Sequence, residues 1–358
     1  MVIGHGGTLL PESLQAINDF FVFDGVTIFF VLSGYLIGGI FINAIEKNGV
    51  NKKVIFLFWM RRWFRTLPSY FLILILLALL RHYLLDGFNF KDIYRYFFFS
   101  QNLAYINPSF FAESWSLSIE EWFYLLIPIC ITFIYIIFKV TTKQAIVFTS
   151  IALIGLVTSY RYYRYSSFTV NNFVDWDRTI RKEVFTRLDS LMFGLIGAYF
   201  SYYKRESWLK NKTLLFVLGI LLMLITKYVL PSFTTINSLY SITFSFSLIS
   251  IATLLLLPYL SQLKTLKGRF SKCITVISVI SYAMYLLHLS IVRDWMINRI
   301  PWKNLVQEGN GLITFKYVLY WFILISISIL FYKYFEIKMT SLRDNEKLKK
   351  WMSNLFKN

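Results

Sequence analysis

The sequence predicts an all-α integral membrane protein, a polytopic helical bundle with about ten spans. The chain of 358 residues is 57% hydrophobic and only 16% charged, whereas about a quarter of the residues in a soluble domain are charged. Uninterrupted apolar runs recur, and each has about the 20 residues that a helix needs to cross a ~30 Å hydrocarbon core. Only helices and closed barrels satisfy the backbone in lipid, and barrel strands are much shorter than these runs.

Each predicted span is an apolar run bounded by charged or turn-forming residues. Met1–Leu10 is too short to cross a membrane, and a mixed loop follows to Phe23. Nine further spans are expected, at Asp24–Asn43, Leu67–Leu85, Leu117–Phe138, Gln144–Tyr163, Leu188–Tyr203, Thr213–Leu230, Ser238–Leu260, Ile274–Ile297 and Gly311–Phe335. Pro68 is expected in the first turn of its span, and Asp86–Ser116 is aromatic and only partly membrane-like.

His5 lies in the short first segment, with only four residues before it. If it belongs to a first span, that helix is truncated at the N-terminus. A full-length chain would then add roughly 15 residues, the shortfall against a ~20-residue span.

The chain is expected to form one membrane domain, residues 1–340, with a charged tail, residues 341–358, that includes Lys347, Lys349 and Lys350. If the connections alternate between two sides, the side with the Arg61 loop and the tail carries most of the lysine and arginine. The positive-inside rule places this side, and with it the C-terminus, in the cytoplasm. The net charge of +18 then needs no nucleic-acid partner.

Most basic residues of the opposite side lie in one loop, Arg161–Arg187. That concentration has two interpretations, a surface for an anionic acceptor or an ordinary solvated loop. The two cysteines, Cys130 and Cys273, fall in or near different spans without metal-ligand spacing, so neither a disulfide framework nor a metal site is expected.

Two adjacent carboxylates, Glu120 and Glu121, lie at the mouth of the apolar run that continues to Phe138. A charged residue at mid-bilayer costs roughly 2.5–3.5 kcal/mol on insertion scales, so it persists only when it is paired or faces a polar cavity. These glutamates are therefore candidates for a buried site inside the bundle. The alternative is a pair of interfacial glutamates wetted by lipid headgroups.

Three arginines, Arg61, Arg62 and Arg65, precede the span that begins at Leu67. Arg62 and Arg65 are three residues apart and share one helical face. A guanidinium is planar, always charged and matched to phosphate oxygens, as a nucleotide-bearing donor in the cytoplasm would require. Alternatively, these arginines only set topology or touch anionic lipid headgroups.

Among the three histidines, His5 precedes a glycine pair at a span end and is the candidate general base, because an imidazole with a pKa near 6.5 is suited to deprotonating a hydroxyl. His82 lies beside Arg81 and is expected at the interface. His288 follows Tyr285 by about one turn inside a span, where the simplest interpretation is a buried histidine bonded to a neighbour.

Ser33 and Gly34 could suggest a nucleophile, but no Gly-x-Ser-x-Gly elbow surrounds them. Small residues there are more typical of close helix packing. Arg187 and Asp189 head a span and are expected to pair with other spans rather than with each other. Glu336 ends the last span near the proposed cytoplasmic surface.

Together, these motifs resemble the membrane-bound acyltransferase 3 family over nearly the whole chain. The motifs that carry the resemblance are GVTIFFVLSGYLI, RRWFRTLPSYF, ESWSLSIEEWFYLLIP, RLDSLMFG, SYAMYLLH and YKYFE. The family's Gly-Val-Asp is Gly25-Val26-Thr27 here, with Asp24 just before it, and its Pro near the last Glu is replaced by Ile337-Lys338.

The resemblance implies a ten-helix O-acyltransferase of a bacterial inner membrane. Such enzymes move an acyl group, usually acetyl, from cytoplasmic acyl-CoA to a hydroxyl of a surface carbohydrate such as O-antigen, capsule or exopolysaccharide. His5, Glu120 and Glu121 match the catalytic positions, and Arg61, Arg62 and Arg65 match the donor-binding motif. We expect an acceptor site formed by Asp24, Trp115, Arg187, Asp189, Tyr285 and His288, no metal, and a carbohydrate or lipid-linked glycan acceptor.

A transporter or flippase of lipid-linked sugars is the alternative function, since ten spans with intramembrane carboxylates suit it as well. Such transporters usually show internal repeats and helices broken near the midplane. The sequence shows no convincing repeat, which favours the acyltransferase. A scaffold without catalysis is disfavoured by the cost of burying these charges.

Overall fold

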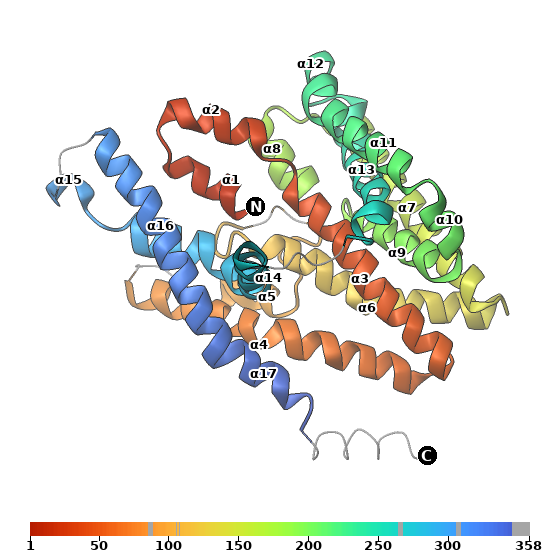
Figure 1. Ribbon diagram of the computed structural model, residues 1–358. Helices are drawn as coiled ribbons and strands as arrows, with labels where there is room; N and C mark the ends of the chain where they lie inside the picture. Colours follow the sequence, from red (N-terminus) through yellow and green to blue (C-terminus); the bar gives the residue numbers. More distant parts are fainter. Residues whose placement is uncertain (85–88, 105, 107, 264–267, 306–308, 346–358) are drawn as a thin grey trace.

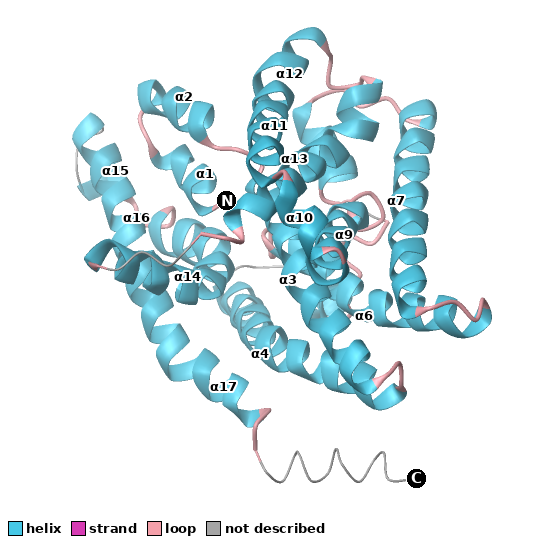
Figure 2. Cartoon of the chain, turned by 45° about the vertical axis from the view of Figure 1, so that its right-hand side comes forward, coloured by secondary structure: helices cyan, strands magenta, loops and turns pink. Residues whose placement is uncertain are grey.

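The computed structural model describes residues 1–84, 89–104, 106, 108–263, 268–305 and 309–345, and these form helices and loops (Figures 1 and 2). The α-helices are α1 Val2–Gly6, α2 Glu12–Phe21, α3 Gly25–Asn48, α4 Lys52–Leu84, α5 Tyr94–Phe97, α6 Ser114–Ile137, α7 Thr142–Ser167, α8 Phe173–Trp176, α9 Leu188–Tyr203, α10 Arg205–Lys210, α11 Lys212–Leu224, α12 Leu230–Phe233, α13 Ser245–Leu260, α14 Arg269–Leu287, α15 Trp302–Leu305, α16 Asn310–Phe331 and α17 Ile337–Leu342. Short 3₁₀ turns are η1 Gly7–Leu9 and η2 Phe90–Ile93, and π-helical segments are η3 Asp177–Arg181, η4 Ile225–Val229, η5 Tyr240–Phe244, η6 His288–Ile297 and η7 Tyr332–Glu336.

The predicted polytopic helical bundle is confirmed. Within the described ranges, 8 helical runs are long and apolar enough to cross a membrane, at Glu12–Asn48, Lys52–Leu84, Ser114–Ile137, Thr142–Ser167, Lys212–Phe233, Tyr240–Leu260, Ser271–Ile297 and Asn310–Leu342. The run Leu188–Tyr203 is helix α9 with the predicted bounds, although its 16 residues are fewer than a full span. The short predicted first segment contains only α1 and η1. The tail residues Lys347, Lys349 and Lys350 lie outside the described residues.

Two details of the predicted spans are wrong. The mixed loop before Phe23 contains helix α2, and α4 begins at Lys52, so that Pro68 lies inside a 33-residue helix rather than in its first turn. Hydropathy locates only the lipid-facing part of a helix, whereas backbone hydrogen bonding continues through the arginine-bearing turns before it. The arginine motif is therefore on the same rigid helix as the apolar span.

Helices α3 and α9 pack in close contact, as small residues in a membrane helix allow. A Cβ atom on Gly34 would lie 2.0 Å from the backbone oxygen of Leu191, and one on Gly194 would lie 2.2 Å from that of Val31. Large apolar side chains, including Phe30 and Leu195, fill the core around this contact. The expected packing role of the small residues near Ser33 is thus confirmed at Gly34.

Replacing Gly34 by alanine is expected to destabilise the fold by about 3 kcal/mol or more, at the upper end of overpacking costs, because the added methyl group would overlap a backbone oxygen. Thermal unfolding of the purified protein in detergent measures the loss. Gly39→Ala is the matched control, since nothing lies within 4 Å of a Cβ atom there. Equal stability of the two variants would contradict the close contact.

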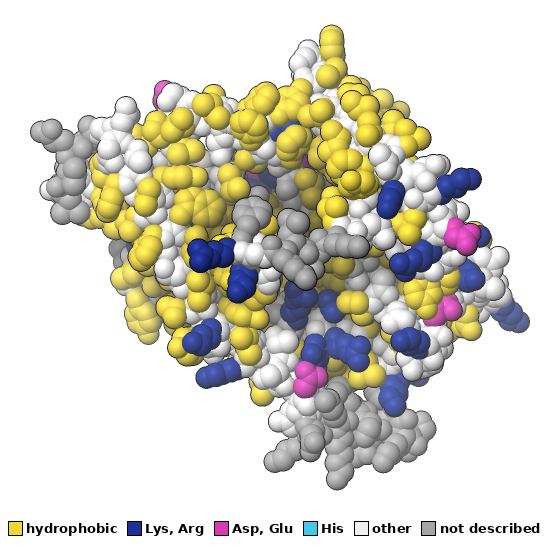
Figure 3. Space-filling view, in the orientation of Figure 1, with side chains coloured by type: hydrophobic (Ala, Val, Ile, Leu, Met, Phe, Trp, Pro, Cys, Tyr) yellow, Lys and Arg dark blue, Asp and Glu magenta, His cyan; other side chains and the backbone are white. Residues whose placement is uncertain are grey.

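The α3–α4 and α6–α7 connections, α10 and the end of α17 lie toward the bottom and lower right of Figure 1. We call this side of the molecule the basic face. In the space-filling view, lysine and arginine side chains gather over this part, while hydrophobic side chains dominate the upper part around α2 and α12 (Figure 3). The charge distribution therefore follows the alternation of the spans.

Candidate active site

A cavity of about 630 Å³ opens at the basic face between α4, α14, η7 and α17, a volume typical of small-molecule sites. Its lining includes the three predicted arginines, and it also includes Arg343, which the sequence analysis missed because no motif marks the segment after α17. The lining residues are Arg61, Arg62, Arg65, Ser278, Val279, Ser281, Tyr282, Tyr332, Glu336, Ile337, Thr340, Ser341, Arg343 and Asp344.

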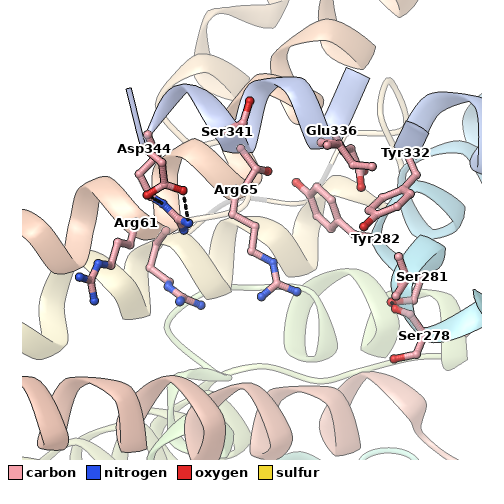
Figure 4. Close-up of a pocket in the computed structure, with 14 residues that line it drawn as sticks. Arg61, Arg65, Ser278, Ser281, Tyr282, Tyr332, Glu336, Ser341 and Asp344 are labelled. Carbon is pink, nitrogen blue, oxygen red and sulfur yellow. Dashed lines mark hydrogen bonds and ion pairs between the residues drawn. The ribbon is translucent and has the colours of Figure 1, made fainter. Parts of the chain in front are cut away.

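Three of the cavity arginines come from α4, and Arg62 and Arg65 both reach the cavity, as their shared helical face predicted. In Figure 4, Arg61 and Arg65 point to the same side, while Tyr282, Tyr332 and Glu336 gather at the other end. Arg62 is buried and its Nε atom has no hydrogen-bond partner; the Oε1 atom of buried Glu336 has none either. Unsatisfied buried groups of this kind are uncommon in native proteins, and both belong to residues that line the cavity.

Glu120 and Glu121 are buried, with exposed fractions of 5% and 8%, which excludes the interfacial alternative. Glu120 accepts hydrogen bonds from the hydroxyls of Ser33 on α3 and Tyr124 on its own helix. Glu121 accepts one from Thr66 of α4 at 2.6 Å, and Tyr282 donates to the Thr66 carbonyl at 2.9 Å. Both carboxylates therefore lie behind the arginine cavity and tie α3, α4 and α6 together.

The two histidines of the candidate site meet although they are 283 positions apart in the chain. His5 Nδ1 lies 2.7 Å from His288 Nε2, and the rings are parallel to within 4°. His288 Nδ1 lies 2.7 Å from the carbonyl oxygen of Tyr285. His288 is fully buried, whereas His5 is partly exposed. Burial, and secondly the neighbouring His288, lower the pKa of His5 well below 6.5, which keeps it a neutral base.

The segment that begins at His288 is fixed by Glu113, a residue that sequence reasoning did not single out. Its carboxylate accepts hydrogen bonds from the Ser290 amide at 3.1 Å and hydroxyl at 2.6 Å. Burial raises the pKa of the Glu113 carboxyl to about 7. The Tyr285 hydroxyl donates to the Glu113 carbonyl at 2.6 Å and contacts Ser116. These bonds join the start of α6 to the end of α14.

Asp24, Trp115 and Arg181 form a second polar cluster. The Arg181 guanidinium lies 3.6 Å from Asp24 and 5.5 Å from the centre of the Trp115 ring, and its charge acts on His5. Asp24 also caps α3 and accepts from the Thr27 hydroxyl at 2.6 Å. The carboxylate of Asp24 thus contacts Thr27. Thr27 occupies the position of the aspartate in the Gly-Val-Asp motif of the family that this sequence resembles. We call Asp24, Trp115 and Arg181 the Arg181 cluster.

Arg187 and Asp189 bind to other helices, as predicted. Arg187 donates to the Thr27 hydroxyl at 2.6 Å and lies 3.7 Å from the centre of the Phe246 ring. Asp189 forms an ion pair with Arg161 of α7 at 2.6 Å and accepts from Ser247 at 3.0 Å. Arg161 and Asp189 are both fully buried.

The Arg161–Arg187 loop is not an ordinary solvated loop, which was one of its two interpretations. Arg161 and Arg187 are fully buried, Arg164 pairs with Glu183, and Arg181 and Lys182 both pair with Asp177. Most of this positive charge is therefore neutralised inside the protein, because the carboxylates of Asp189 on α9, of Glu183 and of Asp177 in η3 lie against it. Arg178 is exposed.

Helix α14 connects the cavity with the histidine pair. Tyr282 lines the cavity, Tyr285 contacts α6, and His288 follows at the start of η6. Six residues of helix advance by about 9 Å, so the cavity and the histidine pair are offset by about this distance along the helix. In the part of the chain that the structure describes, no group of three or more potential metal ligands occurs.

Comparison with known proteins gives a consistent set of relatives. A family model described as acyltransferase domain matches residues 1–332. O-acetyltransferase OatA of Staphylococcus aureus strain NCTC 8325 is 30% identical over 301 residues, 75% of this chain and 46% of that protein. A putative O-acetyltransferase of S. aureus strain COL is 28% identical over 295 residues, again 75% of this chain and 46% of that protein.

Peptidoglycan O-acetyltransferase OatA of Listeria monocytogenes is 30% identical over 151 residues, 38% of this chain and 24% of that protein. The chain thus spans about half the length, or less, of the curated relatives it matches. No solved structure gives a significant match.

Proposed function

Because this chain belongs to the acyltransferase domain family, whose model covers residues 1–332, we propose that it is a membrane O-acyltransferase. It moves an acyl group, acetyl in the first instance, from acyl-CoA in the cytoplasm to a hydroxyl group of a carbohydrate of the bacterial cell surface. The observation that carries this proposal is the connection, along one helix, of an arginine-lined cavity with a neutral histidine pair.

The donor end of the site is the arginine cavity. Coenzyme A is a polyanion, and the planar guanidinium forms paired bonds with phosphate oxygens. Arg61, Arg62, Arg65 and Arg343 line one cavity, and this supports a phosphate site there. The basic face then faces the cytoplasm, together with the described end of α17, as the positive-inside rule requires.

The transfer itself takes place at His5. Nε2 of His5 removes the proton of the acceptor hydroxyl as its oxygen attacks the thioester carbonyl. The carbon–oxygen bond forms, the carbon–sulfur bond breaks, and the leaving thiolate takes the proton back from His5. His5 is partly exposed, and its lowered pKa keeps the ring neutral at physiological pH, so the Nε2 lone pair can accept the hydroxyl proton. Glu120 and Glu121 hold the helices that position the donor.

The acceptor end is the Arg181 cluster together with Arg187 and Tyr285. The Tyr285 ring lies 5.6 Å from the His288 ring, and the charge of Arg181 acts on His5; aromatic and charged side chains of this kind suit a polar sugar ring better than a lipid chain. Relatives named for O-acetylation, one of them for peptidoglycan, support a cell-envelope glycan as the acceptor. Peptidoglycan therefore joins O-antigen, capsule and exopolysaccharide as a candidate.

Acetyl transfer in membranes tests the proposal. Inside-out vesicles that contain the protein and are loaded with each purified glycan are incubated with radiolabelled acetyl-CoA, and label in the glycan is counted after mild alkali, which releases O-acetyl groups. Protein-dependent, alkali-labile label is the expected result. Movement of a lipid-linked sugar across the vesicle membrane without consumption of acetyl-CoA would instead support the transporter alternative.

Replacing Arg65 by alanine is expected to raise the KM for acetyl-CoA by about 10- to 100-fold, because a hydrogen bond to a charged group contributes about 1.5–3 kcal/mol. The KM for the glycan should stay within a few-fold of the native value. Steady-state kinetics in vesicles measures both constants. Arg205→Ala is the matched control, an exposed arginine of α10 that does not line the cavity. An unchanged KM in the Arg65 variant would leave this residue as a topology signal.

A further inference from the structure

We propose that His288 is a positioning residue that fixes the tautomer of His5, so that Nε2 of His5 carries the lone pair and Nδ1 carries the proton. The assignment of the tautomer follows from two hydrogen bonds. Its consequence for catalysis rests on the proposed function, because only an acyltransferase needs His5 as a base.

The tautomers of both histidines follow from the Tyr285 carbonyl, which can accept a hydrogen bond but cannot donate one. His288 Nδ1 lies 2.7 Å from the carbonyl oxygen of Tyr285, and a carbonyl only accepts, so His288 Nδ1 carries a hydrogen. In a neutral imidazole the other nitrogen is then an acceptor. His288 Nε2 therefore accepts from His5 Nδ1 at 2.7 Å. His5 Nε2 is left without a hydrogen and is the basic nitrogen.

The neutral state of His288 follows from its surroundings. The ring is fully buried, and its two hydrogen bonds go to a carbonyl and to another imidazole. Neither partner carries the negative charge that a buried cation needs.

The local fold explains why the two rings meet in this geometry. His288 is the first residue of η6, a π-helical segment of the kind often found at functional sites. Helix α1 packs against η6, and the two Glu113–Ser290 hydrogen bonds hold η6 in place. Helix α1 thus holds the ring of His5, and the fixed segment η6 holds the parallel ring of His288.

During transfer, the hydrogen bond between His5 and His288 stabilises the positive charge that develops on His5. When Nε2 takes the proton, the Nδ1–H bond to His288 becomes charge-assisted and stronger. The proton goes no further than the two rings, because the Tyr285 carbonyl is not a base at physiological pH. In the Ser-His-Asp triad a carboxylate fixes the tautomer of the base. Here an uncharged ring does so, which avoids a second charge in the membrane.

Nuclear magnetic resonance tests the tautomer directly. The chain has 3 histidines, so selective ¹⁵N labelling gives few ring signals, and His5→Gln and His82→Gln assign them. The expected native signals of His5 are a protonated Nδ1 and an unprotonated Nε2. A native His5 with the proton on Nε2, or with both nitrogens protonated at pH 7, would overturn the proposal. This measurement is independent of acetyl transfer.

Two substitutions of His288 separate positioning from packing. In His288→Gln the amide oxygen replaces Nε2 and still accepts from His5; in His288→Asn the shorter amide reaches only the Tyr285 carbonyl. The expected result is a kcat about 10²-fold lower for the Asn variant, a kcat within about 10-fold of native for Gln, and an unchanged KM for acetyl-CoA in both. Equal kcat values for Gln and Asn would overturn the positioning role.

Val292→Ala serves as the packing control, since Val292 is fully buried in η6 and contacts neither ring through a hydrogen bond. It is expected to lower the unfolding temperature without moving the His5 signals. If the native protein shows the expected tautomer but no acetyl transfer, the proposed function fails while the assignment of the tautomer stands.

Discussion

Replacement of His5 by alanine is expected to lower kcat for acetyl transfer by about 10²- to 10⁴-fold, the range that general-base catalysis contributes. The KM values for acetyl-CoA and the glycan should change little, because the base acts in the transition state and the arginine cavity is separate from it. Vesicle kinetics with radiolabelled acetyl-CoA measures kcat and KM together. The variant should still insert and unfold at nearly the native temperature, since His5 is partly exposed.

His82→Ala is the control for the loss of a histidine elsewhere, near the end of α4. It should retain native kinetics. Substantial acetyl transfer by the His5 variant would remove His5 from its role as base and would leave the bound acceptor to be activated by another group.

The pH dependence of kcat follows from the pKa of the His5 imidazole. Burial and His288 hold the pKa of His5 well below 6.5 in the folded protein, and the neutral ring is the active form. His5 is then already neutral at pH 6, so kcat should show no rise with an apparent pKa near 6.5 between pH 5.5 and 8. Loss of rate is expected only as the pH falls toward the lowered pKa. A titration centred near 6.5 would contradict the lowered pKa of His5.

Replacement of Asp189 by leucine is expected to destabilise the protein by about 3–5 kcal/mol, the cost of leaving one partner of a buried ion pair uncompensated. Arg161 is fully buried beside it, at 2.6 Å, and has no access to water. Most of the protein should then fail to accumulate in the membrane. Fluorescence-detected size exclusion and thermal unfolding in detergent measure the loss.

The control is the double replacement Arg161→Met with Asp189→Leu, which removes both charges. Because apolar residues can replace a buried ion pair at little cost, the double variant should regain most of the lost stability. If it remains as unstable as Asp189→Leu, the loss comes from packing and not from an unpaired arginine. Retained stability in the single variant would contradict the stabilising role of the Arg161–Asp189 ion pair.

The sequence was sufficient for the class of fold and for most of the spans. The three-residue spacing of Arg62 and Arg65 predicted a shared face of α4, and both line the cavity. Hydropathy depends on composition within about 20 residues, and this is why α9 has its predicted bounds. It could not find α2, which lies in a mixed segment, or the turns of α4 before Pro68. Arg343 and Glu113 were missed because neither belongs to a spacing pattern with a known chemistry.

The sequence by itself determined that this protein is a helical membrane bundle, that its basic connections fall on one face, and that a few ionisable groups must be buried. Only the tertiary structure decided how those groups pair. It brings His5 to His288 across 283 positions, binds Glu120 and Glu121 to hydroxyls, and neutralises Arg161 with Asp189. Periodicity is a local property of one helix, whereas the choice of partner depends on which helix faces pack together, and that is set by the whole bundle.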